Sequence, residues 1–160
     1  IAFGHGLGCH VCLLRPKSTG EVTLNSNNAF DSPKIDPKFF SKREDMDIMI
    51  KGYRKMMEIM DAEPLRPFTR KVQDPVDINS DADIEEAMRA RADTVYHPVG
   101  TCKMGSDDMS VVNHELKVHA LENVRVVDAS IMPTLVGGNT NAPTIMIGEK
   151  AADMIKSSWA

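Results

Sequence analysis

The chain has 160 residues, of which 42% are hydrophobic and 26% charged, and its formal net charge is −4. This composition is typical of an ordinary folded domain and argues against a disordered chain or a basic nucleic-acid-binding surface. No apolar run reaches the roughly 18 residues that a membrane-spanning helix needs. The three cysteines form no disulfide framework, so we expect a cytoplasmic protein.

The chain begins at Ile1 rather than at a methionine, and its first six residues contain no signal of a domain start. We therefore expect a fragment of a longer protein. At this length the fragment can still bury one hydrophobic core.

Two short strands are the first predicted elements. Residues 9–15 are β-prone and end before a turn at 16–20, and residues 21–25 alternate between polar and apolar side chains. We expect the two segments to pair as an antiparallel hairpin. Cys9 and Cys12 lie three positions apart, so a strand would direct them to opposite faces. We favour buried strand cysteines over a zinc site and expect no metal, because the sequence lacks a second ligand pair.

Residues 26–40 are rich in turn-forming residues, which predicts an ordered surface loop. Ser41 and Glu44 form a capping box that predicts a helix from about 41 to 61. Its apolar side chains recur at helical spacing and form one methionine-rich face, composed of Met46, Met49, Ile50, Tyr53, Met56, Met57 and Met60. We interpret this face as core packing rather than as a groove for a partner.

Prolines at 64, 67 and 75 predict an irregular stretch from 62 to about 79. Ser80 and Asp83 then begin a shorter helix that ends before Thr94. Residues 121–128 are predicted to form a strand that ends in a carboxylate. Pro143 lies in the first turn of a final helix, which we expect from about 141 to 156.

Three segments, 95–105, 123–130 and 137–144, carry the candidate chemistry. Reaction of an alcohol needs one group that takes the hydroxyl proton and another that fixes the oxygen, and His97 and Asn139 can supply these. The glycines before the final helix let a backbone approach a ligand, and the free amides at the helix start favour an electron-rich group. Judged alone, a histidine beside a proline is more often structural, and an asparagine in a glycine-rich loop is more often a turn residue.

Residues 97–105, 126–133 and 138–147 resemble the carboxy-terminal part of the glucose-methanol-choline (GMC) oxidoreductases, an FAD-dependent family. Residues 12–20 and 35–37 resemble the same region, so the resemblance covers nearly the whole chain. Among family members it is closest to bacterial alcohol and choline dehydrogenases that pass electrons to a membrane quinone.

The resemblance implies an α+β fold in two parts. Residues 1–120, including the His97 segment, would belong to the sheet and helices of a substrate-binding domain. Residues 121–160 would supply the C-terminal strand and helix of a split FAD-binding α/β domain. The family's amino-terminal Gly-x-Gly-x-x-Gly turn is absent from this sequence, so we expect the fragment to bind flavin weakly and to be inactive alone.

The resemblance also implies roles for individual residues. His97 would accept the proton of the substrate alcohol, and Asn139 would bind the substrate oxygen, while a hydride passes from the substrate carbon to FAD and leaves an aldehyde. Asp128 and Ala129 match a turn that approaches the flavin pyrophosphate. Four further residues match positions along the isoalloxazine and ribityl chain: Val99, Thr140, Asn141 and Pro143.

Two other functions stay open: a noncatalytic binding module that uses the methionine-rich helix, and a flavin-dependent cyanohydrin lyase of the same fold. The implied partners are the rest of the parent chain, a small-molecule alcohol and an electron acceptor, either a quinone or oxygen. Aromatic residues make up only 5% of the chain, so an aliphatic alcohol is preferred to choline, which would need an aromatic or acidic cage. We expect the parent protein to be cytoplasmic, and the alternative is a cytoplasmic protein that associates peripherally with the inner membrane.

Overall fold

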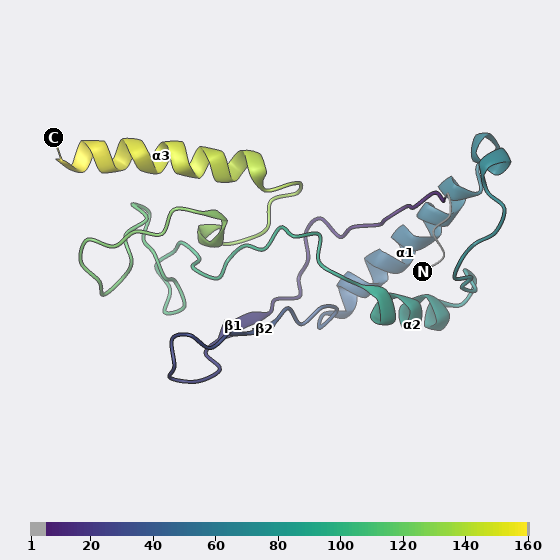
Figure 1. The fold of residues 1–160 in the computed structure, drawn as a ribbon, viewed down its shortest axis with the longest axis horizontal. Coiled ribbons are helices and arrows are strands. Elements are labelled where there is room, and N and C mark those ends of the chain that lie inside the picture. Colours follow the sequence, from purple (N-terminus) through teal and green to yellow (C-terminus); the bar gives the residue numbers. More distant parts are fainter. Residues whose placement is uncertain (1–5, 160) are drawn as a thin grey trace. The chain divides into compact units, whose positions relative to one another are not determined.

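The structure is a computed structural model that describes residues 6–159. The chain divides into two compact units, one with the residues up to Gly20 and Pro37–Asp93, the other with Glu21–Asp36 and the residues from Thr94 onward. Figure 1 labels the elements, which are β1 (Glu21–Thr23), β2 (Lys34–Asp36), α1 (Arg43–Met60), the 3-10 helix η1 (Glu63–Phe68), α2 (Asp81–Arg91), the 3-10 helix η2 (Ala129–Ile131) and α3 (Asn141–Trp159). This mixture of helices with a small sheet agrees with the predicted α+β class. None of the helices formed by the described residues combines the length and apolar character needed to span a bilayer.

The core of the first unit lies between α1 and α2. Four fully or almost fully buried side chains form it: Met46, Ile50, Ile84 and Met88. Met49 and Tyr53 pack against this cluster from the same face of α1. The amino-terminal half of the methionine-rich face therefore packs in a core, as predicted, and its carboxy-terminal half is half-buried.

The two helix starts of this unit differ from each other. Ser80 caps α2, as predicted, because its hydroxyl accepts the amide hydrogen of Asp83 at 3.2 Å. The capping box predicted at Ser41 is wrong: α1 begins at Arg43, and Lys42 precedes it without a side-chain cap. Ser41 instead belongs to a preceding turn, in which its amide donates to the carbonyl of Lys38. The stretch predicted to be irregular also contains η1, which begins with a proline in its first turn.

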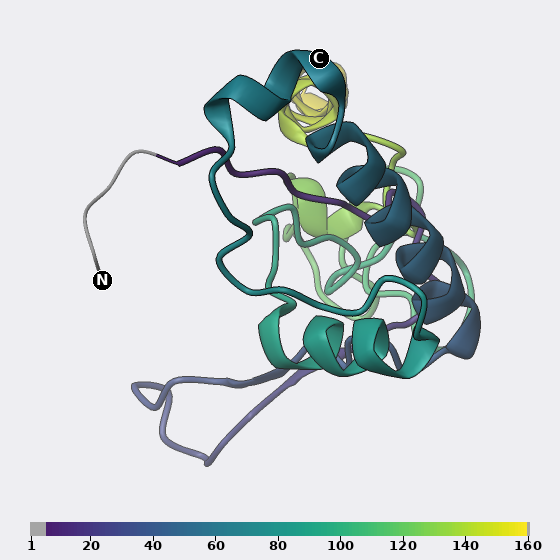
Figure 2. The same cartoon turned by 90° about the vertical axis from the view of Figure 1, so that its right-hand side faces the viewer.

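The predicted strand at residues 9–15 is wrong. This segment has no strand structure and lies along α1 (Figures 1 and 2). The side chain of Val11 approaches Gly52 of α1. Just beyond it, the amides of Lys17 and Ser18 donate to the buried carboxylate of Asp45. These contacts fix the segment against a helix, so it is not available to pair with residues 21–25.

The cysteine prediction fails with that strand, because Cys9 and Cys12 are both exposed. Within residues 6–159, no group of three or more histidine, cysteine, aspartate or glutamate side chains has an arrangement suited to a metal ion.

β1 pairs antiparallel with β2 rather than with the preceding segment, in the register Val22 opposite Ile35. The partner strand thus lies inside the stretch predicted to be a surface loop. The connection between the strands is closed by side chains, since Ser26 and Asn28 both donate to the carboxylate of Asp31, at 2.6 and 3.0 Å. A turn network of this kind lets a longer hairpin form where no two-residue turn is present.

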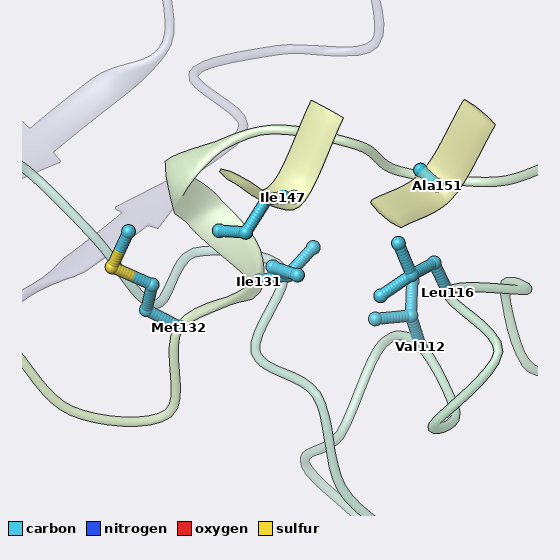
Figure 3. Packing of buried hydrophobic residues seen from close by; sticks show 6 residues of the cluster. All are labelled: Val112, Leu116, Ile131, Met132, Ile147 and Ala151. Atoms are coloured by element: carbon cyan, nitrogen blue, oxygen red, sulfur yellow. The ribbon is translucent and has the colours of Figure 1, made fainter. Parts of the chain in front are cut away.

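The core of the second unit joins α3 to the chain segments below it. Figure 3 shows Ile147 and Ala151 of α3 pointing toward these segments, and the buried cluster consists of Val112, Leu116, Ile131, Met132, Ile147 and Ala151. Because Ile131 belongs to η2, this packing fixes η2 beneath the first half of α3. The same core therefore holds the two predicted site segments that flank residues 131–136.

The strand predicted at residues 121–128 is wrong. The segment makes only an isolated bridge between Lys117 and Arg125, with the Val126 amide donating to the carbonyl of Leu116 at 3.1 Å. Ala120 and Asn123 both have left-handed backbones, with φ of 62° and 60°. These residues form a tight turn that the hydrogen bond from the Val118 amide to the Val124 carbonyl closes, so the chain folds back here instead of extending as a strand.

Candidate active site

Backbone hydrogen bonds bring the first two predicted site segments together. The Cys102 amide donates to the carbonyl of Ser130 at 3.0 Å, and the Met104 amide donates to the carbonyl of Ile131 at 2.8 Å. The chain that follows His97 therefore runs beside η2. Since η2 packs under α3 through Ile131, all three predicted segments belong to one locally packed region of the second unit.

The backbone around His97 is unusual. Tyr96, directly before it, has a left-handed φ of 62° although its side chain is bulky and exposed. Pro98, directly after it, restricts His97 to extended conformations. A bulky residue with positive φ costs free energy, so its presence indicates that the surrounding contacts determine the path of the chain here. The sequence contained no signal for this conformation, because tyrosine is not a residue that favours it.

Both ring nitrogens of His97 have partners from two consecutive residues before α3. Nδ2 of Asn139 lies 3.1 Å from Nε2, and Oγ1 of Thr140 lies 2.9 Å from Nδ1. His97 is half-buried, Asn139 is exposed and Thr140 is buried. The structure thus places the two residues predicted as the catalytic pair in contact, across 42 positions of sequence. The contact of Thr140 with the ring was not predicted, since the family resemblance assigned that residue to the cofactor.

Asp128 caps η2 at the second predicted segment. Its carboxylate accepts hydrogen bonds from both the amide and the hydroxyl of Ser130, and the amide contact is 2.8 Å long. The carboxylate is therefore engaged within its own turn. A ligand at Asp128 and Ala129 would be met by the turn's shape and backbone groups rather than by a free carboxylate.

The remaining predicted residues lie on the same segments as the catalytic pair. Val99 is half-buried and packs against the core, Pro143 is half-buried in the first turn of α3, and Asn141 is exposed at the helix start. The first turn of α3 contains no acidic side chain. No carboxylate of this turn neutralises the positive end of the helix dipole, which suits an electron-rich ligand such as a flavin.

The loop after the His97 segment is closed by an ion pair and by a close backbone approach. Nζ of Lys103 lies 2.9 Å from the carboxylate of Asp107, and this hydrogen bond lowers the pKa of Asp107 below its ordinary value. The Gly105 amide donates to the carbonyl of Val112 at 3.0 Å. A side chain at Gly105 would meet the hydroxyl of Ser110, so a larger residue there would force Ser110 to shift.

The matches to known proteins include the part of the chain that carries the candidate site. A family model described as GMC oxidoreductase matches residues 16–148. The chain is 51% identical over 156 residues to the alcohol dehydrogenase [acceptor] of Pseudomonas putida, covering 97% of this chain and 28% of that protein. It is 44% identical over 157 residues to the oxygen-dependent choline dehydrogenase of Escherichia coli (strain K12), covering 98% of this chain and 28% of that protein.

A solved structure agrees with these relatives. A variant of Aspergillus oryzae RIB40 formate oxidase, studied for its FAD modification, superposes with a TM-score of 0.86 at 34% identity, covering 91% of this chain and 26% of that one. The fold and the site segments are therefore those of a flavin-dependent oxidoreductase. The chain belongs to the GMC oxidoreductase family. It spans about 28% of the length of the curated relatives it matches.

Proposed function

We propose that this chain supplies the catalytic pair and part of the FAD site of a flavoprotein that oxidises an alcohol to an aldehyde. The observation that carries the proposal is the contact of 3.1 Å between Nε2 of His97 and Nδ2 of Asn139. It unites a base with a hydrogen-bond donor, the two groups that proton removal from an alcohol needs. Family membership, with alcohol and choline dehydrogenases among the relatives, supports the same chemistry.

The geometry of the pair suits an alcohol oxygen. An oxygen about 2.9 Å from each of the two nitrogens would complete a nearly equilateral triangle with the observed 3.1 Å side. In that position the hydroxyl takes the place of the Asn139 amide as the donor to Nε2 of His97, and the amide donates to the alcohol oxygen instead. His97 then acts as the base, and Asn139 stabilises negative charge that develops on the oxygen as the proton leaves.

FAD would be held by residues on the segments around this pair. The turn at Asp128 and Ala129 would approach the pyrophosphate, and the isoalloxazine and ribityl chain would lie along Val99, Thr140, Asn141 and Pro143. The uncharged first turn of α3 supports this arrangement. When bound, FAD supplies the acceptor for the hydride that leaves the substrate carbon.

The rest of the enzyme, its substrate and its acceptor belong to the same proposal. Residues 1–120 would form part of the substrate-binding domain, and residues 121–160 would complete the FAD-binding domain. The substrate would be a small aliphatic alcohol, and a quinone or oxygen would reoxidise the flavin. The enzyme would work in the cytoplasm. If its acceptor is a quinone, it would attach peripherally to the inner membrane.

The test uses the purified flavoprotein that contains this sequence, mixed without oxygen with aliphatic alcohols, choline and a cyanohydrin. We expect an alcohol to bleach the flavin absorbance while one equivalent of aldehyde forms per flavin. Release of aldehyde from the cyanohydrin with the flavin left oxidised would instead establish a lyase. A protein whose flavin no alcohol reduces, and which releases no aldehyde, would be a binding module, and the proposed function would be wrong.

A further inference from the structure

We infer that Thr140 is a positioning residue, which holds His97 in the tautomer with its proton on Nδ1. Nε2 is then the acceptor nitrogen, and it takes the substrate proton once the substrate hydroxyl replaces the Asn139 amide hydrogen there. This inference rests on the proposed role of His97 as the base. The observation behind it is the 2.9 Å contact between Oγ1 of Thr140 and Nδ1 of His97.

The contact with Asn139 selects this tautomer, and the contact with the Thr140 hydroxyl is compatible with it. A neutral imidazole has one N–H donor and one acceptor nitrogen. Asn139 donates its amide hydrogen to Nε2 at 3.1 Å, so Nε2 must be the acceptor and Nδ1 must carry the proton. The hydroxyl of Thr140 can accept that proton in a hydrogen bond of ordinary length. The third contact, from the Thr140 amide to Nδ1, would favour the opposite tautomer, but at 3.5 Å it is the longest and weakest of the three.

The hydroxyl of Thr140 is held firmly in this position. Thr140 is only 7% exposed, and its carbonyl accepts hydrogen bonds from both the amide and the hydroxyl of Thr144, at 3.0 and 2.6 Å. A threonine directly before a helix commonly uses its hydroxyl to cap the first turn. Here the hydroxyl contacts the His97 ring, so it fixes the orientation of that ring relative to α3.

This arrangement suits a base that changes charge. Nδ1–H donates to Thr140 in the neutral ring, and the same bond persists after Nε2 takes the substrate proton. It then becomes a charge-assisted hydrogen bond and is stronger. Thr140 therefore stabilises the protonated ring without any rearrangement, which is the part that an orienting residue plays beside a catalytic base.

The experiment compares Thr140→Val, Thr140→Ser and Thr144→Val in the flavoprotein, with nitrogen NMR of the His97 ring and the pH profile of kcat/KM. Thr140→Val keeps the shape of the side chain and removes its hydroxyl. We expect kcat to fall about tenfold to a hundredfold, the range that corresponds to a lost hydrogen bond to a charged group. The acid limb of the profile should move to lower pH, because the protonated ring loses more stabilisation than the neutral one. Thr140→Ser should restore both properties.

Thr144→Val is the matched control, because its hydroxyl bonds the Thr140 carbonyl and not the ring, and the Thr144 amide still bonds that carbonyl in the variant. It should leave the pH profile and the ring tautomer unchanged. The wild-type NMR spectrum, which does not depend on any variant folding, should show the proton on Nδ1. A proton on Nε2 in the wild type, or a Thr140→Val profile identical to the wild-type profile, would overturn the inference. His97→Ala in the same assay separates the two proposals, since retained turnover there would overturn the proposed function instead.

Discussion

Removal of the Asp45 carboxylate should release the segment that lies along α1. Asp45 is 1% exposed and accepts the amide hydrogen of Lys17 at 2.9 and 3.1 Å, through its two oxygens, and that of Ser18 at 2.7 Å. A hydrogen bond to a charged group contributes about 1.5–3 kcal/mol, and such contributions do not simply add. We therefore expect Asp45→Ala to reduce the free energy of opening of this segment by about 3 kcal/mol.

Hydrogen exchange of peptides that contain Lys17 and Ser18 measures this opening directly. A loss of about 3 kcal/mol corresponds to exchange that is about a hundredfold faster at these amides. Asp47→Ala is the matched control, because that carboxylate also lies on α1 but pairs with Arg43 at the surface. Unchanged exchange at Lys17 and Ser18 in Asp45→Ala, or an equal acceleration in the control, would refute this account of the segment.

The same carboxylate should make the segment sensitive to acid. Burial alone raises the pKa of Asp45, but the hydrogen bonds from Ser18 and Lys17 outweigh it and hold that pKa below its ordinary value of 3.8. A carboxyl whose pKa is lowered by folding stabilises the folded form above its unfolded pKa, and this stabilisation is lost as the pH falls through the folded value. Protection of the Lys17 and Ser18 amides, corrected for intrinsic exchange, should therefore be constant near neutral pH and decrease only below about pH 4. A decrease between pH 7 and 5 would contradict the assignment of this protection to the Asp45 carboxylate.

Two glycines provide further tests by double substitution, each followed by the midpoint of thermal unfolding. A Cβ at Gly105 would lie 2.4 Å from Oγ of Ser110, so Gly105→Ala should lower the free energy of unfolding by about 1–3 kcal/mol. Adding Ser110→Ala should recover most of this loss. If the effects of the two substitutions simply add, the two residues do not approach each other closely. A Cβ at Gly52 would lie 2.5 Å from Cγ2 of Val11, so Gly52→Ala should destabilise α1 despite the higher helix propensity of alanine, and Val11→Ala in the same chain should relieve the clash. A single Gly52→Ala variant that is more stable than the wild type would show that Val11 does not pack there.

The sequence predicted the helices well where local spacing decides them. The apolar positions of α1 and the Ser80 cap of α2 depend on residues three or four positions apart, and both patterns are visible without a structure. The strand pairing could not be predicted in this way. Residues 9–15 have suitable propensity for a strand, but the position of that part of the chain is determined by Asp45 and Gly52, which lie more than 25 positions further along.

The candidate site shows the same contrast between features that local sequence predicts and features that depend on residues far apart in the chain. His97 and Asn139 could be proposed from their motifs, and the structure places them in contact. The left-handed backbone of Tyr96 and the hydrogen bond between Thr140 and the His97 ring could not be predicted. Both depend on how η2 and the start of α3 pack, and neither residue type indicates such a role by itself.

The most direct test of the central claim is the turnover of His97→Ala in the full flavoprotein, with flavin content measured in the same sample. Loss of the base should lower kcat by on the order of a hundredfold or more, because positioned proton transfer contributes about that much. Asn139→Ala removes a hydrogen bond rather than a base and should cost less, and both variants should keep their flavin. A His97→Ala enzyme that retains its flavin and oxidises alcohol at nearly the wild-type rate would show that another group takes the proton, and would contradict the account.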